Sequence, residues 1–171
     1  MTPSEKVVHP IPALYDRDSR ILILGSFPSV KSREQQFFYA HPQNRFWKVL
    51  AGITGSAVPE TVEEKKNFLH ASHIALWDTI HSCTITGSSD SSIRDVVPND
   101  LTPVLEAADI RAIFCNGGTS YRLYGKYLEP ATGRRAVKLP STSPANAAWR
   151  LDRLKEAWKV MLLYLQDGPA A

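Results

Sequence analysis

The segment Arg20-Ile-Leu-Ile-Leu-Gly25 is a short, uninterrupted apolar run that a glycine ends. Such a run, without polar alternation, is typical of a strand that is buried on both faces of a parallel sheet. Similar short runs predict three more strands, at residues 73–78, 111–116 and 135–139. Segments with helical spacing of their apolar residues separate these strands. This alternation predicts an α/β fold, a three-layer α/β/α sandwich around a mostly parallel four-stranded sheet.

The expected helices fill the intervals between the strands. Thr61, followed by Glu64 three residues later, forms a capping-box pattern at the start of one of them. The expected helices cover residues 44–53, 61–72, 98–108, 119–128 and 145–166. Residues 83–95 are expected to form the longest loop, and long loops in compact domains are commonly functional or mobile.

Length and composition limit the class of protein. The 171 residues are the length of one domain, and we expect one domain over residues 1–171 with loose ends at about residues 1–10 and 167–171. No apolar run approaches the roughly 18 residues that a membrane span needs, and the N-terminus does not resemble a secretory signal. The chain has only two cysteines, too few for a disulfide framework. We expect a cytoplasmic protein without membrane contact.

The positive charge is concentrated in the C-terminal third of the chain. The net charge is +3, yet residues 126–159 contain eight lysines and arginines against three acidic residues. Clustered basic side chains favour binding to a polyanion, because each can neutralise a phosphate. A solvated helix face with paired charges is the alternative interpretation.

Several familiar functional motifs are missing. No GxxxxGK[ST] or GxGxxG loop follows a strand, so we expect no nucleotide cofactor. The five histidines show neither HExxH nor paired Cys/His spacing, so we expect no metal. The turn Gly25-Ser-Phe-Pro-Ser29 lacks the GxSxG pattern of a serine hydrolase.

Polar turns follow each of the expected strands, at residues 25–29, 78–79, 116–118 and 140–144. Because ligands bind at the carboxyl ends of parallel strands, we expect these four turns to converge on one site. An aromatic cluster, FFYAHPQNRFW at residues 37–47, suits a flat heteroaromatic ligand, which needs stacking and edge hydrogen bonds. The alternative is that its last aromatic residues form the core face of the following helix.

Four motifs together carry a resemblance to a known family: GSFPS at residues 25–29, FFYAHPQNRFW at 37–47, LWDTIHSC at 76–83 and LPSTSPAN at 139–146. In this order they resemble the uracil-DNA glycosylase superfamily, most closely its hypoxanthine-DNA (deoxyinosine) glycosylase branch, family 6. The resemblance extends over about residues 10–165. It implies a monofunctional DNA repair glycosylase that flips out and hydrolytically excises deaminated bases, hypoxanthine first and uracil second. We expect it to act as a monomer on DNA that contains such a base.

The resemblance also implies roles for individual residues. Phe27 stands where other branches place the Asp or Asn that orients the attacking water, and Asn44 of the H-P-x-N segment is implied to replace it. A carboxamide can accept a hydrogen bond from water but cannot remove its proton. Capping of the following helix is the alternative role for Asn44.

The remaining implied residues fall into two groups. The base is expected to contact Ser26, Phe27, Tyr39, Phe46, Asp78, Asn116 and Ser141, with Asp78 accepting a hydrogen bond from the base. The DNA backbone is expected to contact Ser29, Lys31, Arg45, Ser143, Asn146 and Arg150. A helix or turn cap is the alternative for Asp78, and the start of a turn is the alternative for Asn116. At the level of function, the alternatives are a uracil- or mismatch-specific glycosylase and a non-catalytic nucleic-acid-binding module.

Overall fold

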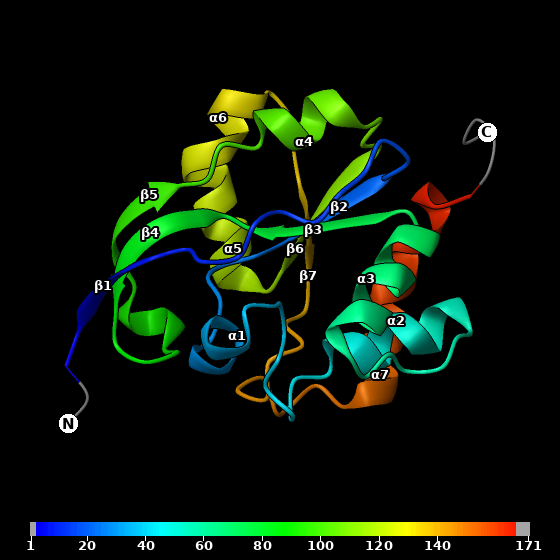
Figure 1. Ribbon diagram of the computed structural model, residues 1–171, viewed down its shortest axis with the longest axis horizontal. Coiled ribbons are helices and arrows are strands. Elements are labelled where there is room, and N and C mark those ends of the chain that lie inside the picture. The colour runs from blue at the N-terminus through cyan, green and yellow to red at the C-terminus, as the bar shows by residue number, and fades with distance from the viewer. Residues whose placement is uncertain (1–2, 167–171) are drawn as a thin grey trace.

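Residues 3–166 are described in the computed structural model of the protein (Figure 1). A parallel four-stranded sheet with the order β3-β2-β6-β7 forms its centre. The strands are β2 (Ile21–Gly25), β3 (Ile74–Asp78), β6 (Ala112–Asn116) and β7 (Val137–Leu139). The four expected strands are therefore confirmed, each beginning one or two residues later than expected. The expected loose end at 167–171 lies outside the described residues.

Helices cover both faces of this sheet. Ile21 and Ile23 of β2 pack into one apolar core with α2, α3 and α7, whereas Leu22 and Leu24 pack into a second core with α4 and η2. Figure 1 shows the two groups of helices on opposite sides of the sheet. The three-layer α/β/α sandwich is thereby confirmed. The helices named here are α2 (Phe46–Thr54), α3 (Val62–Ala71), α4 (Thr102–Ala107), α7 (Leu151–Trp158) and the π-helical turn η2 (Tyr124–Leu128).

A second, antiparallel sheet of order β1-β4-β5 was not expected from the sequence. Its strands are β1 (Glu5–Val8), β4 (Ile80–Ile85) and β5 (Arg94–Pro98). The expectation of a loose end is therefore wrong for residues 5–8, which form β1, and the segment 83–95 is not one continuous loop, because β4 extends to Ile85 and β5 begins at Arg94. β1 is mostly exposed and β5 is exposed or half-buried, so neither shows the apolar run of a buried strand. Only β4 buries its side chains, with Ile80, Cys83 and Ile85 packed in a small core.

The helix boundaries differ from the expected ones mainly near the pocket described below. Residues 145–150 form a loop and α7 begins at Leu151, not at residue 145. At α3, the Thr61 hydroxyl accepts a hydrogen bond from the backbone of Glu64 at 3.0 Å, as its capping pattern predicts. The other elements are α1 (Val30–Gln35), α5 (Gly118–Leu123), α6 (Glu129–Thr132), and the 3₁₀ turns η1 (Asp90–Ser92) and η3 (Lys159–Tyr164). No helix within residues 3–166 is long and apolar enough to cross a membrane.

Candidate active site

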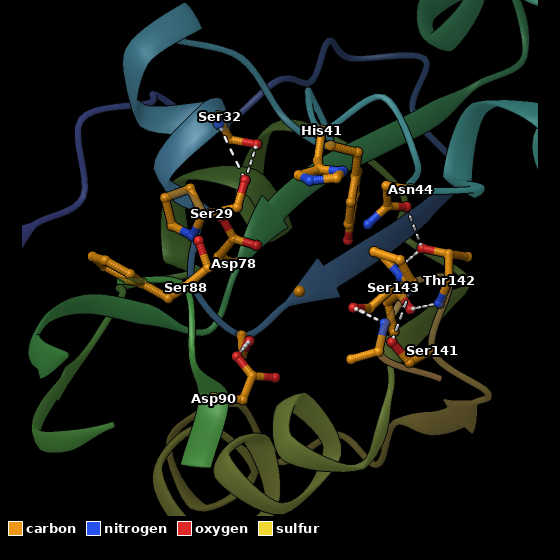
Figure 2. Close-up of a pocket in the computed structure, with 18 of the residues that line it drawn as sticks. Ser29, Ser32, His41, Asn44, Asp78, Ser88, Asp90, Ser141, Thr142 and Ser143 are labelled. Atoms are coloured by element: carbon orange, nitrogen blue, oxygen red, sulfur yellow. Dashed lines mark hydrogen bonds between the residues drawn. The ribbon is translucent and has the colours of Figure 1, made fainter. Parts of the chain in front are cut away.

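A pocket of about 590 Å³ opens at the carboxyl ends of the central strands (Figure 2). The pocket lies beside the neighbouring strands β2 and β6. The chain continues from β2 to β3 on one side of this pair and from β6 to β7 on the other side. Parallel α/β sheets commonly bind ligands at such a position. All four turns that were expected to converge contribute residues to its wall. Residues 88–91, between β4 and β5, form a further side. A volume of this size accommodates a nucleobase and part of its sugar.

Most of the predicted site residues reach this pocket. Those lining it are Ser26, Phe27, Ser29, Tyr39, Asn44, Asp78, Asn116, Ser141 and Ser143. Asn146 lines an adjoining groove that shares part of the same wall. Phe46, Lys31, Arg45 and Arg150 do not line the pocket.

Asn44 lies in the pocket wall, and two hydrogen bonds fix the orientation of its carboxamide. Its Oδ1 accepts a hydrogen bond from the backbone N–H of Phe46 at 3.0 Å and another from the Thr142 hydroxyl at 2.8 Å. The first bond satisfies a free N–H at the start of α2, as the capping alternative expected. The capping role is therefore observed, and the same side chain also lies in the pocket wall, where the water-positioning role remains a prediction.

Tyr39 and Phe46 form a stacked pair, with ring centroids 4.0 Å apart and an interplanar angle of 17°. Only Tyr39 lines the pocket, while Phe46 is fully buried behind it. The alternative that placed Phe46 in the helix core is the one that the structure supports. Trp47 is likewise a core residue and donates its indole N–H to the Tyr39 carbonyl at 3.2 Å.

The Tyr39 phenol remains protonated. Burial raises its pKa, the Asp78 carboxylate raises it further, and the Asn116 side chain opposes part of this shift. The hydroxyl is buried and makes no hydrogen bond of ordinary geometry with the described residues. Tyr39 also has a φ of 50°, an unusual backbone conformation that is often found at functional sites. A neutral, buried O–H donor without a hydrogen-bond partner among the described residues therefore lies next to Gly25, in a residue of the pocket wall.

Asp78 forms part of the pocket floor and is almost fully buried. Its Oδ2 accepts a hydrogen bond from His9 Nε2 at 2.7 Å, and His9 Nδ1 accepts one from the backbone N–H of Ile11 at 3.1 Å. Because Nδ1 is an acceptor, it carries no proton, and the ring is the neutral tautomer with its hydrogen on Nε2. The other carboxylate oxygen, Oδ1, lies beside the Cα atom of Gly25, where an added Cβ would be 2.4 Å away. Asp78 therefore presents an acceptor at the floor of the pocket.

His9 is a site residue that the sequence did not indicate. It lies just after β1, in the segment that was expected to be loose, and no motif includes it. Its ring also contacts Phe27 edge to face, with centroids 5.7 Å apart. Phe27 is itself buried and packs with the core of the small sheet while lining the pocket. Only the pairing of β1 with β4 brings His9 to the site, and this pairing was not visible in the sequence.

Asp90 is a second site residue that was missed, although its loop was flagged as a candidate for function. The Ser26 hydroxyl donates to Asp90 Oδ1 at 3.0 Å. Desolvation raises the pKa of the Asp90 carboxyl, the hydrogen bond from Ser26 lowers it, and the Asp78 carboxylate raises it. The loop is attached to α1, since the Val30 N–H donates to Ser88 Oγ at 2.9 Å and Arg33 donates to the Gly87 carbonyl at 2.7 Å.

Arg45 binds the loop that follows β7. Part of this loop, residues 145–150, was expected to be helical. Its guanidinium donates to the backbone carbonyls of Thr142 at 3.4 Å, Ser143 at 2.9 Å, Asn146 at 3.2 Å and Trp149. These bonds use four of its five N–H donors. The geometry gives Arg45 an organising role within the protein.

Among the other residues expected at the DNA backbone, Ser29 and Ser143 line the pocket, whereas Lys31 and Arg150 do not. Ser29 is the N-cap of α1, and its hydroxyl accepts a hydrogen bond from the Ser32 N–H at 3.1 Å. Ser143 Oγ accepts from the Ala145 N–H at 3.2 Å, within the loop after β7. Lys31 is exposed, 3.8 Å from Glu34, and Arg150 is the exposed N-cap of α7.

The side chains of residues 3–166 offer no group of three or more His, Cys, Asp or Glu that could hold a metal ion. Both cysteines are buried, and burial raises the pKa of the Cys83 and Cys115 thiols to about 11. Thiols with such a pKa are weak nucleophiles at neutral pH. The groups that line the pocket are therefore carboxylates, carboxamides, hydroxyls, aromatic rings and the imidazole of His41.

Comparisons with known proteins agree with this architecture. The family model of the uracil DNA glycosylase superfamily matches residues 12–162. The chain is 33% identical over 151 residues to a hypoxanthine DNA glycosylase of Methanosarcina acetivorans, an alignment that covers 88% of this chain and 94% of that protein. It is 31% identical over 152 residues to a hypoxanthine DNA glycosylase of Methanosarcina barkeri, covering 86% and 92% of the two chains.

A solved structure gives the same result at the level of the fold. A solution NMR structure of a candidate uracil DNA glycosylase from Methanosarcina acetivorans superimposes with a TM-score of 0.78 at 32% identity. The match covers 93% of this chain and 99% of that chain. By sequence and by fold, the chain belongs to the uracil-DNA glycosylase superfamily.

Proposed function

We propose that the protein is a monofunctional DNA glycosylase that flips deaminated bases out of DNA, hydrolyses their N-glycosidic bond and leaves an abasic site for repair. Hypoxanthine is the principal substrate and uracil the second. Two relatives of this chain are hypoxanthine DNA glycosylases, and they align over most of it. The observation that carries the substrate class is the free acceptor oxygen of Asp78 on the pocket floor.

A carboxylate acceptor at this position distinguishes hypoxanthine and uracil from their parent bases, adenine and cytosine, by their hydrogen-bonding edge. Adenine and cytosine present a ring nitrogen with a lone pair there, at N1 and N3, whereas hypoxanthine and uracil present an N–H. Asp78 Oδ1 can accept from that N–H, but it would face the lone pair of the parent base. A buried polar group that lacks its partner strongly disfavours the wrong ligand. The neutral His9 ring keeps Oδ2 occupied, so that Oδ1 remains available.

Several features of the pocket support hydrolysis of the glycosidic bond by a water molecule. A nucleobase in the pocket can stack against Tyr39, whose rear face is supported by Phe46. The protonated Tyr39 hydroxyl is a donor for the negative charge that develops on the departing base. No lysine within residues 3–166 lines the pocket, which favours direct hydrolysis over a Schiff base. We also propose that the protein acts as a monomer.

The test uses duplex oligonucleotides that each hold one hypoxanthine, uracil or xanthine, with unmodified duplex as the control. Alkali treatment after incubation converts each abasic site into a strand break. We expect the fastest cleavage with hypoxanthine and none with unmodified DNA. Cleavage of uracil alone would instead support a uracil- or mismatch-specific glycosylase. Specific binding without cleavage of any substrate would support a non-catalytic module.

A further inference from the structure

We propose that Asn44 acts through its amide N–H as a hydrogen-bond donor, and that Thr142 is the positioning residue that fixes it in this orientation. The proposal rests on the glycosylase function proposed above and specifies how its catalytic carboxamide works. It differs from the sequence-based expectation, in which the Asn44 oxygen accepts a hydrogen bond from the attacking water.

The orientation of the Asn44 carboxamide follows from its two partners. The backbone N–H of Phe46 can only donate, so the atom 3.0 Å from it must be the carboxamide oxygen. The Thr142 hydroxyl lies 2.8 Å from the same oxygen. A carboxamide oxygen has two lone pairs, and these two bonds use both. Figure 2 shows the oxygen turned toward Thr142 and the nitrogen toward the pocket.

The direction of the Thr142 hydroxyl is fixed by Asn116 in turn. The backbone N–H of Thr142 donates to Asn116 Oδ1 at 3.1 Å, which identifies the other terminal atom of Asn116 as its nitrogen. That nitrogen donates to Thr142 Oγ1 at 3.0 Å. Since Thr142 Oγ1 accepts this bond, its own proton is free to point to Asn44. The order of donation is therefore Asn116 to Thr142 to Asn44, and Thr142 is completely buried.

This polarity changes the chemistry that Asn44 can perform. Its Nδ2–H donates to the oxygen of the attacking water, which leaves the other lone pair of that oxygen to form the bond to C1′. The C1′–N9 bond breaks, its electron pair leaves with hypoxanthine, and the proton lost by the water passes through solvent to the departing base. Asn44 neither gains nor loses a proton. Its contribution is to place the water, and loss of such a contact typically costs about 10²–10³ in rate.

The decisive variant is Asn44→Asp, which has nearly the same shape. Its Oδ1 can still accept from Phe46 and Thr142, but its pocket-facing atom becomes an oxygen that can only accept. We expect excision of hypoxanthine near pH 7.5 to fall by about a hundredfold or more. We also expect part of the loss to be recovered as the pH is lowered, because a protonated carboxyl regains a donor. Activity equal to or above that of the wild type would show that Asn44 acts as an acceptor and would overturn the proposal.

Thr142 is tested by Thr142→Val, which keeps the branched shape and removes the hydroxyl, and by Thr142→Ser, which restores the hydroxyl. We expect kcat to fall about tenfold to a hundredfold in the valine variant, with little change in KM, and most of this loss to be recovered in the serine variant. Thermal unfolding of each variant checks that the fold is retained. A valine variant with wild-type kcat would overturn the positioning role.

A measurement that does not depend on catalysis separates this proposal from the proposed function. The side-chain ¹⁵N–¹H₂ signals of Asn44, assigned by their absence from the spectrum of Asn44→Asp, should shift in Thr142→Val and return toward wild-type values in Thr142→Ser. A wild-type protein that excises no base but shows this shift would reject the glycosylase function and keep the orientation of Asn44. Signals that do not respond to Thr142→Val would reject the orientation, whether or not the enzyme is active.

Discussion

Asp78 and His9 are separated by 69 positions in the sequence, yet His9 Nε2 lies 2.7 Å from the Asp78 carboxylate on the pocket floor. The sequence indicated Asp78 because it ends an apolar strand in a recognisable motif. It did not indicate His9, because no local pattern marks a side chain that reaches the site only through pairing between distant strands. The carboxylate could therefore be predicted, but the group that sets its orientation could not.

The role of Asp78 is tested by Asp78→Asn. The new carboxamide oxygen would accept the His9 N–H, so its NH₂ group would face the floor and meet the N–H of hypoxanthine donor to donor. We expect hypoxanthine excision to fall by a hundredfold or more, a loss of the size seen when a buried polar group and a substrate are mismatched (about 10⁴ at the upper end). The measurement is kcat/KM in the oligonucleotide assay, with thermal unfolding as the control. An unchanged kcat/KM would mean that the base is read elsewhere.

Gly25 is expected to be required because no larger side chain fits at this position, and not because its backbone adopts a conformation that only glycine favours. A Cβ at this position would lie 2.4 Å from Asp78 Oδ1 and 3.0 Å from the Tyr39 hydroxyl, so alanine would displace the groups that form the floor. We expect Gly25→Ala to lower the free energy of unfolding by about 1–3 kcal/mol, as overpacking does, and to reduce excision. Gly125→Ala is the matched control, because a Cβ there meets nothing within 4 Å. Equal effects of the two substitutions, measured by denaturant unfolding, would contradict this reading.

At the scale of elements, the central strands were predictable and the small sheet was not. β2 has an unbroken apolar sequence because helices cover both of its faces, and this burial leaves a clear pattern. β1 is mostly exposed, and β4 pairs with β5 through irregular register. Strands of this kind depend on pairing across the sheet, which local sequence does not encode. The expected helix at residues 145–150 failed for a similar reason, since Arg45 from a distant segment binds the carbonyls of that loop.

The loop after β7 is therefore expected to depend on Arg45. Lysine has a single ammonium group and cannot reproduce the planar fork that serves four carbonyls, so Arg45→Lys should loosen residues 143–149. We expect amide hydrogen exchange in this loop to become about tenfold faster or more, and excision to fall, while exchange in the central strands stays unchanged. Unchanged exchange at the loop amides would show that other contacts hold it. The control is Lys48→Arg, the opposite substitution at an exposed position of α2.

At the scale of the whole molecule, the basic C-terminal third does not act as one uniform surface. Lys138 lines the groove that adjoins the active-site pocket, together with Asn146 and Trp149. Lys159, at the start of η3, instead has its Nζ 2.9 Å from the carboxylate of Glu156 in α7. The excess of positive charge could be counted in the sequence, but its division between a part beside the pocket and a part paired with acidic residues could not. We expect the part beside the pocket, represented by Lys138, to meet the phosphates that flank a flipped nucleotide.

This division predicts how DNA binding should respond to salt. Each phosphate contact that is lost should reduce the slope of log Kd against log salt concentration by about 0.9 for duplex DNA. We expect Lys138→Gln to weaken binding of an inosine-containing duplex and to reduce this slope by about one, and the matched Lys159→Gln to change neither. The measurement is fluorescence anisotropy at a series of potassium chloride concentrations. A wild-type affinity that does not depend on salt would assign the basic residues to a solvated surface, and equal effects of the two substitutions would remove the groove from the DNA interface.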